Sequence, residues 1–173
     1  ADVMELPYAD ETFDVVVCQF SCMFFPDRAA AYREIHRVLR PGGTFLFSIW
    51  NGIEHNEFAD VVTHAVGALY PEDPPLFLAR TPHGHGIPAE IEGDVKSAGF
   101  NRCSLTQRDD VSLAAGPEVP AIAYVQGTPL RNEIEARDSG GLERATEAAT
   151  AAIRRRFGDG PIEARISAVI IAS

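Results

Sequence analysis

The sequence predicts a doubly wound α/β fold, in which a mostly parallel sheet carries helices on both faces. The run from Phe13 to Gln19 is short, apolar and rich in valine, a pattern typical of a strand buried on both faces of a parallel sheet. A helical pattern and a second strand-like run, Thr44 to Trp50, follow it. Strand, helix and strand in this order almost always place the two strands side by side and parallel, through a right-handed crossover.

The first helix is expected to begin at Asp27, whose carboxylate suits the N-cap position. Apolar residues then recur every three or four positions until Pro41-Gly42-Gly43, which predicts the helix end. Residues 1–11 are expected to be irregular. After Trp50 the sequence predicts a helix over 58–70, a loop or lid over 71–88, and a short helix over 89–98 that Gly99 ends.

The last third of the chain predicts two strands separated by helices. A strand is expected from Phe100 to about Arg108, and the last strand from Arg165 to Ala172. Helical stretches over 118–126 and 131–157 lie between them. A long helical segment, not a hairpin turn, therefore connects the last two strands.

Composition restricts the classes of partner. The chain has 173 residues, 46% of them hydrophobic, which is enough for the core of one ordinary domain. Its longest apolar runs are strand-sized, far short of the roughly 20 residues that cross a bilayer, so no membrane partner is expected. A formal charge of −10 opposes attraction to phosphate backbones, so no nucleic acid is expected either.

The cysteine count and the first residues favour a cytoplasmic protein. Three cysteines, an odd number, argue against a disulfide framework and for free thiols in a reducing compartment. The first five residues carry acidic side chains and no basic cluster, unlike the start of a signal peptide.

Three motifs carry a family resemblance. Residues 2–16, DVMELPYADETFDVV, closely resemble the D-A-x-x-L-P-F-x-D-x-x-F-D-x-V signature of small-molecule class I S-adenosylmethionine-dependent methyltransferases. Residues 34–43, EIHRVLRPGG, resemble the family's E-x-x-R-V-L-x-P-G-G segment, and residues 95–100, VKSAGF, are similar to its L-x-x-A-G-F segment. Each motif alone is common, but three in this order at fitting distances are specific.

The resemblance implies a strand order. The family's Rossmann-like sheet has the order 3-2-1-4-5-7-6 with strand seven antiparallel, and residues 1–173 are expected to be the C-terminal part of one such domain, with strands four to seven. The glycine-rich cofactor loop after strand one and the acidic ribose ligand after strand two have no counterpart here. Residues 51–89 are expected to form a lid or substrate segment, and residues 109–164 a helical insertion before the last strand.

The resemblance also assigns cofactor-binding residues. It implies that Asp2 accepts a hydrogen bond from the adenine amine of S-adenosylmethionine and that the backbone amide of Val3 meets a ring nitrogen. A carboxylate suits an exocyclic amine because it only accepts hydrogen bonds and forms charge-assisted ones. The alternative for Asp2 is a loop aspartate that caps a turn.

Gln19, Phe20 and Ser21 lie at the carboxyl end of the first strand, where open α/β sheets place their ligands. The resemblance implies that they line the methionine part of the cofactor. An aromatic ring such as that of Phe20 attracts a sulfonium cation through its π face.

Catalysis is expected to need no nucleophile from the protein. Methyl transfer is an in-line displacement, accelerated mainly by holding donor and acceptor close and aligned. A general base helps when the acceptor is a hydroxyl or an acidic carbon, and His55, just beyond Trp50, is the preferred candidate. Its alternative is an ordinary loop histidine.

No metal site is expected. His83-Gly84-His85 offers two ligands, which do not make a zinc site. Cys18 and Cys22 lack the further cysteines of an iron–sulfur motif, and Cys18 is expected to behave as a small buried hydrophobe.

The leading functional hypothesis is transfer of a methyl group from S-adenosylmethionine to an oxygen, nitrogen or carbon atom of a small-molecule acceptor. Its main alternative is a non-catalytic interaction or dimerisation module, because an unpaired outer edge on the first strand would invite a homodimer. A nicotinamide-dependent reductase ranks last, since no G-x-G-x-x-G follows any of the expected strands.

Overall fold

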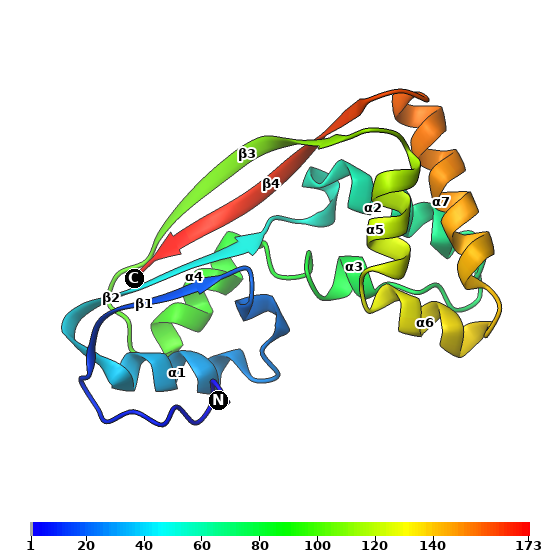
Figure 1. The fold of residues 1–173 in the computed structure, drawn as a ribbon. Coiled ribbons are helices and arrows are strands. Elements are labelled where there is room, and N and C mark those ends of the chain that lie inside the picture. Colours follow the sequence, from blue (N-terminus) through cyan, green and yellow to red (C-terminus); the bar gives the residue numbers. More distant parts are fainter. Residues whose placement is uncertain (1) are drawn as a thin grey trace. The chain divides into compact units, whose positions relative to one another are not determined.

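The computed structural model describes residues 2–173 and contains a four-stranded sheet of order β1-β2-β4-β3 (Figure 1). Strand β1 (Phe13–Gln19) pairs in parallel with β2 (Leu39–Trp50), and β2 pairs in antiparallel fashion with β4 (Ile162–Ala172). Strand β3 (Ser104–Ala114) completes the sheet. The order and directions expected for strands four to seven, read as 4-5-7-6, are confirmed.

Seven α-helices and two short 3-10 helices connect these strands in the described chain. They are η1 (Cys22–Phe24), α1 (Arg28–Val38), η2 (Ile53–His55), α2 (Glu57–Gly67), α3 (Phe77–Arg80), α4 (Pro88–Ser97), α5 (Glu118–Gln126), α6 (Leu130–Arg137) and α7 (Leu142–Phe157). The predicted N-cap is confirmed, since the Asp27 carboxylate accepts a hydrogen bond from the amide of Ala30.

Several predicted boundaries were wrong. The strand expected from Phe100 to about Arg108 is β3, which spans Ser104–Ala114. Two other differences have local reasons. The single helix predicted over 131–157 is two helices, because a turn containing Gly140 and Gly141 separates α6 from α7. Strand β2 begins at Leu39, not at Thr44, and the Pro-Gly-Gly run lies inside it. Gly42 takes a φ of 83°, a conformation that favours glycine, and the pairing of β1 with β2 shifts register between Phe13 and Val15.

The chain divides into two compact units. The first contains the chain up to Asn51, residues 85–108 and residues 168–173, and the second contains residues 52–84 and 109–167. Strands β3 and β4 contribute residues to both. The sequence segments expected to form a lid and a helical insertion, 51–89 and 109–164, supply most of the second unit.

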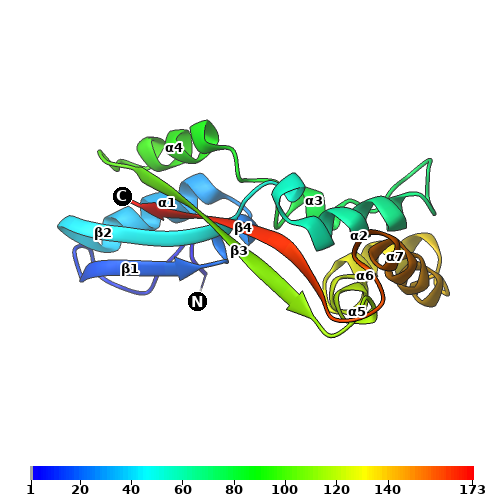
Figure 2. The same cartoon turned by 90° about the horizontal axis from the view of Figure 1, so that it is seen from above.

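In the first unit, α1 and α4 pack against one face of the sheet. The side chains of Tyr32 and Ile35 on α1 and of Val95 on α4 are buried in one cluster with alternate residues of β2 and β4. Those strand residues are Phe45, Phe47, Ile49, Val169 and Ile171. Arg28 joins the two helices through an ion pair with Asp94, in which Nε and Oδ2 are 2.9 Å apart. Figure 2 shows α1 and α4 beside the strands of this unit from a second direction.

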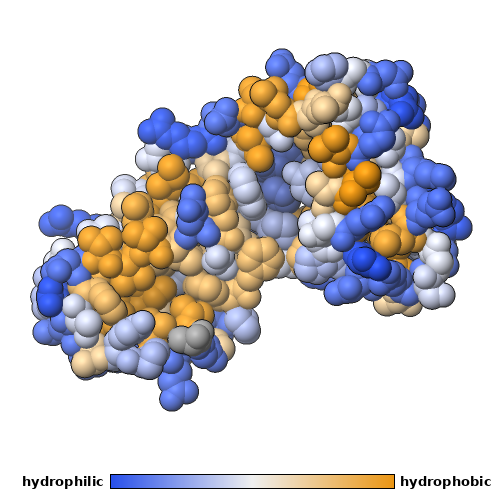
Figure 3. Space-filling model, in the orientation of Figure 1, coloured by the Kyte–Doolittle hydropathy of each residue, from blue (hydrophilic) through white to orange (hydrophobic). Residues whose placement is uncertain are grey.

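On the opposite face of the first unit, several apolar side chains of the sheet are exposed. Val15 and Val17 on β1 are 53% and 64% exposed, and Leu46 and Ile170 on the neighbouring strands are exposed as well. Figure 3 shows apolar residues gathered on the surface of this unit. A run of three valines does not distinguish one buried face from two, because β-branched residues favour any strand.

The second unit has its own core, in which α2, α5 and α7 pack together. Phe58, Val62 and Ile153 are among its buried side chains. Glu57 at the start of α2 accepts a hydrogen bond from the backbone amide of Arg165, which fixes the first half of β4 to this helix. None of the helices within residues 2–173 is long and apolar enough to span a membrane.

Candidate functional site

The candidate site lies in the first unit, where the parallel strands β1 and β2 end at Gln19 and Trp50. Gln19 pairs with Ser48 in the last step of the ladder. Gln19 and Ser21 are exposed, whereas Phe20 is half-buried. The predicted cofactor-binding residues after β1 are therefore accessible at the carboxyl edge of the sheet, the usual position of ligands in open α/β sheets.

Phe20 has an unusual backbone conformation. Its φ of 50° lies in the left-handed region, which large side chains seldom adopt. Its amide nitrogen is 3.0 Å from the carbonyl oxygen of Ser48 and 3.3 Å from the Ser48 hydroxyl oxygen, so it donates to the neighbouring strand. Left-handed residues of this kind persist where the surroundings hold them, and they concentrate at functional sites.

The ring of Phe20 lies flat against the indole of Trp50. The ring centroids are 4.1 Å apart and the ring planes are inclined by 20°. Both side chains are half-buried. The sequence predicts that each residue lies at the end of a strand, but it does not predict that their rings stack. The available signal was that residues ending adjacent parallel strands lie side by side.

Asp2 takes the turn-capping position that was its alternative interpretation. Its Oδ1 accepts a hydrogen bond from the amide of Met4 at 2.9 Å, and its carbonyl oxygen accepts one from the amide of Glu5. The side chain is nevertheless exposed. A carboxylate has about four lone-pair positions, so the turn leaves Asp2 able to accept a further hydrogen bond. Val3 is half-buried against the core of the first unit.

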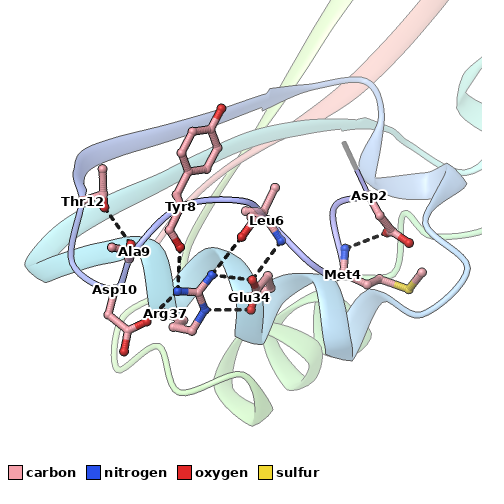
Figure 4. Close-up of polar contacts among 9 residues, drawn as sticks. All are labelled: Asp2, Met4, Leu6, Tyr8, Ala9, Asp10, Thr12, Glu34 and Arg37. Atoms are coloured by element: carbon pink, nitrogen blue, oxygen red, sulfur yellow. Dashed lines mark hydrogen bonds and ion pairs between the residues drawn. The ribbon is translucent and has the colours of Figure 1, made fainter.

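The segment that contains Asp2 is fastened to α1 by Glu34 and Arg37 (Figure 4). Glu34 Oε1 accepts a hydrogen bond from the amide of Leu6 at 2.9 Å. Arg37 donates to the carbonyl oxygens of Leu6 and Tyr8 at 3.2 and 2.9 Å, and it forms an ion pair with Asp10. The hydrogen bond from Arg37 is the main cause that lowers the pKa of Glu34. The two longest motifs of the sequence are thus in direct contact.

Cys18 is not the small buried hydrophobe that was predicted. It is only half-buried, and a hydrogen bond with the Cys22 thiol lowers its pKa to about 7. Cys22 is buried, and the hydrogen bond with Cys18 together with burial raises its pKa. The three cysteines are free thiols, as predicted.

The remaining candidates belong to other elements. His55 belongs to the second unit, where its Nε2 is 3.4 Å from Oε1 of Glu54. His85 belongs to the first unit and is hydrogen-bonded to Arg28, with Nη1 of Arg28 at 2.8 Å from Nδ1. Within residues 2–173, no group of three His, Cys, Asp or Glu side chains is arranged to hold a metal ion.

Comparisons with known proteins agree in family. Residues 1–47 match the family described as "Methyltransferase domain". The chain is 37% identical over 123 residues to the methyltransferase GfsG of Streptomyces halstedii, a match that covers 70% of this chain and 40% of that protein. It is 29% identical over 123 residues to the ubiquinone/menaquinone biosynthesis C-methyltransferase UbiE of Shewanella woodyi, covering 66% of this chain and 49% of that protein.

The fold also has solved relatives. A protein of Bacillus halodurans C-125 described as a methyltransferase aligns with 99% of this chain and 68% of its own, with a TM-score of 0.53 and 15% sequence identity. At this identity the likeness concerns the fold alone. In sequence, the matches reach less than half the length of the two curated relatives.

Proposed function

Because this chain belongs to the class I S-adenosylmethionine-dependent methyltransferases, we propose that it takes part in methyl transfer to a small-molecule acceptor. The observation that carries the proposal is the exposed carboxyl edge of β1 and β2, where Phe20 and Trp50 form an aromatic pair in the unit that also holds the signature segment. Figures 1 and 2 place the beginning of that segment on the side of the unit where β1 ends.

The residues present fit half of a cofactor site. The Asp2 carboxylate accepts a hydrogen bond from the adenine amine, with lone pairs that its hydrogen bond with Met4 leaves unused. The backbone amide of Val3 donates a hydrogen bond to a ring nitrogen of the adenine. Gln19, Phe20 and Ser21 line the methionine part at the strand end. S-adenosylmethionine, when bound, supplies the methyl group from its sulfonium centre. The role of the chain is to bind and orient, which is the main requirement of an in-line displacement.

The acceptor is proposed to be a small molecule with an apolar body. The segments 51–89 and 109–164 shape its pocket, and the half-buried aromatic side chains of Phe77, Tyr124 and Phe157 in the second unit support an apolar lining. UbiE, a relative over 123 residues, is a C-methyltransferase by name. For a hydroxyl or an acidic carbon nucleophile, the acceptor must lose a proton, and His55 is the proposed base that takes it.

The proposal extends to location and assembly. Three free thiols support a cytoplasmic location. Strand β1 is the first in the sheet order, and Val15 and Val17 expose apolar surface on it, which supports a homodimer. Sedimentation velocity of the wild type and of Val17→Lys tests this: the dimer is supported if the lysine lowers the sedimentation coefficient, and contradicted if both proteins sediment as monomers.

Calorimetric titration with S-adenosylhomocysteine tests the function directly. We expect binding that Asp2→Ala weakens. Asp2→Asn is the matched variant, because it retains an oxygen that can accept from Met4 but loses the charge. Weakening by both variants supports adenine recognition by the carboxylate. Weakening by alanine alone reduces Asp2 to a turn cap, and absence of binding to the wild type contradicts cofactor binding by this chain.

A further inference from the structure

Three contacts from β2 converge on Phe20. The carbonyl and hydroxyl oxygens of Ser48 accept its amide hydrogen bond, and the indole of Trp50 covers one face of its ring. Ser48 and Trp50 lie two positions apart on the same strand, so their side chains point to the same face of the sheet. The end of β2 therefore fixes both the backbone and the ring of the residue that follows β1.

We propose that Trp50 is a positioning residue of the cofactor site, which holds the ring of Phe20 where it meets the positively charged sulfonium. This inference rests on the proposed function and adds to it a residue that acts through Phe20.

The geometry of the ring pair suits this role. Centroids 4.1 Å apart with nearly parallel planes leave no room for a ligand between the rings, so a cation must approach from the outer side. A cation over an aromatic face is attracted when it lies within about 6 Å of the ring centroid. Phe20 packs against the core of the first unit and remains partly exposed at the carboxyl edge.

The left-handed backbone of Phe20 explains why a partner is needed. Such a conformation is unfavourable for a residue with a side chain unless its surroundings stabilise it. Without Trp50, the ladder bonds to Ser48 remain, but the ring loses the surface that fixes its direction. The predicted defect is therefore in the placement of the ring, not in the pairing of β1 with β2.

A comparison of a charged and an uncharged ligand distinguishes positioning of the Phe20 ring by Trp50 from a general contribution of Trp50 to the stability of the fold. S-adenosylmethionine carries the sulfonium charge, whereas S-adenosylhomocysteine lacks it. In Trp50→Leu we expect the affinity for S-adenosylmethionine to fall about fivefold, the size of a typical cation–π contribution, and the affinity for S-adenosylhomocysteine to change less than about twofold. Trp50→Phe, which retains an aromatic surface, should recover part of the loss. Equal losses for both ligands would overturn the proposal.

A second variant tests the ring that Trp50 positions. Phe20→Gly removes the ring, and glycine adopts a φ of 50° without strain, so the turn should persist. It should reproduce the selective loss seen in Trp50→Leu, and the double variant should lose no more than either one. Additive losses in the double variant would mean that Trp50 acts independently of Phe20.

The single tryptophan provides a readout that needs no catalytic activity. Trp50 is the only tryptophan of the chain, so its fluorescence and its indole N–H resonance report on this position alone. If calorimetry detects neither cofactor form in the wild type, the proposed function fails, and titration with trimethylsulfonium ion then decides the inference. A saturable shift of the indole resonance that Phe20→Gly abolishes supports the ring platform, and the lack of any shift refutes it.

Discussion

Glu34 and Arg37, one turn apart on α1, are joined by two hydrogen bonds, at 2.9 Å from Nε to Oε2 and at 2.5 Å from Nη2 to Oε1. The pair is more than a local ion pair, because each side chain also binds the backbone of the signature segment at Leu6. Leu6 and Glu34, which are 28 positions apart in the sequence, are thereby held together. This contact gives a physical reason for the two motifs to occur in one chain.

The first prediction concerns that contact. Arg37→Lys keeps the charge but cannot form the paired guanidinium bonds, so we expect the segment to loosen from α1. The amide of Leu6 should exchange its hydrogen about three to ten times faster, as measured by hydrogen exchange with NMR detection. Arg40→Lys is the control, since Arg40 pairs with Asp14 instead of with Leu6. Unchanged exchange in Arg37→Lys would contradict the clamp.

The second prediction is loss of stability in acid. The pKa of Glu57 is lowered from 4.5, first by the hydrogen bond from the amide of Arg165, and that of Glu34 is lowered from the same value by Arg37. A carboxyl group with a lowered pKa in the folded state stabilises the protein above its ordinary pKa. That stabilisation is lost as pH falls below about 4.5 through the lowered pKa.

Thermal unfolding between pH 7 and pH 3 measures this loss. The Glu57→Gln variant should melt below the wild type at pH 7, because glutamine does not provide the charge that Arg156 pairs with. The gap should narrow toward pH 3, where the wild-type carboxylate becomes protonated. A gap that stays constant with pH would show that the carboxylate charge contributes nothing.

The third prediction uses the thiols. Because the hydrogen bond with Cys22 lowers the pKa of Cys18 to about 7, much of Cys18 is thiolate near neutral pH. Iodoacetamide should therefore modify Cys18 faster than Cys103, whose pKa is raised by burial. In Cys22→Ala the Cys18 thiolate loses its hydrogen bond, so its alkylation profile should shift to higher pH. Site-resolved mass spectrometry gives both rates in one sample, and an unshifted profile would rule out Cys22 as the cause.

The sequence predicted the strands and their order more fully than the packing over the two faces of the sheet. The apolar run of β1 and the Asp27 cap are local signals, and the order of strands came from the family resemblance. The exposed face was missed because the exposure of Val15 and Val17 depends on what packs over the sheet, which three consecutive valines do not encode.

The site was predictable in position but not in geometry. The end of a parallel strand pointed to Gln19, Phe20 and Ser21, because ligands gather there whatever the side chains. The left-handed φ of Phe20 and its stacking on Trp50 depend on contacts between strands, and no short-range pattern carries them. The roles of Glu34 and Arg37 were not predicted either. Their partners at Leu6 and Tyr8 are backbone groups, which every residue has, so the sequence does not indicate these contacts.

The fourth prediction compares two neighbouring isoleucines on β4 that face opposite sides of the sheet. Ile171 is fully buried against α1 and α4, whereas Ile170 is 37% exposed on the uncovered face. Truncation to alanine removes the same atoms at both positions, so the two losses of unfolding free energy compare how much each face of the sheet stabilises the fold. Ile171→Ala should lower the free energy of unfolding by about 3 kcal/mol, through lost burial and a cavity, and Ile170→Ala by less than about 1 kcal/mol. Urea denaturation followed by circular dichroism measures both. Comparable losses would mean that the face of Ile170 is covered in solution, as a homodimer through this face of the sheet would require. A dilution series of the wild type would then give the concentration at which the dimer dissociates.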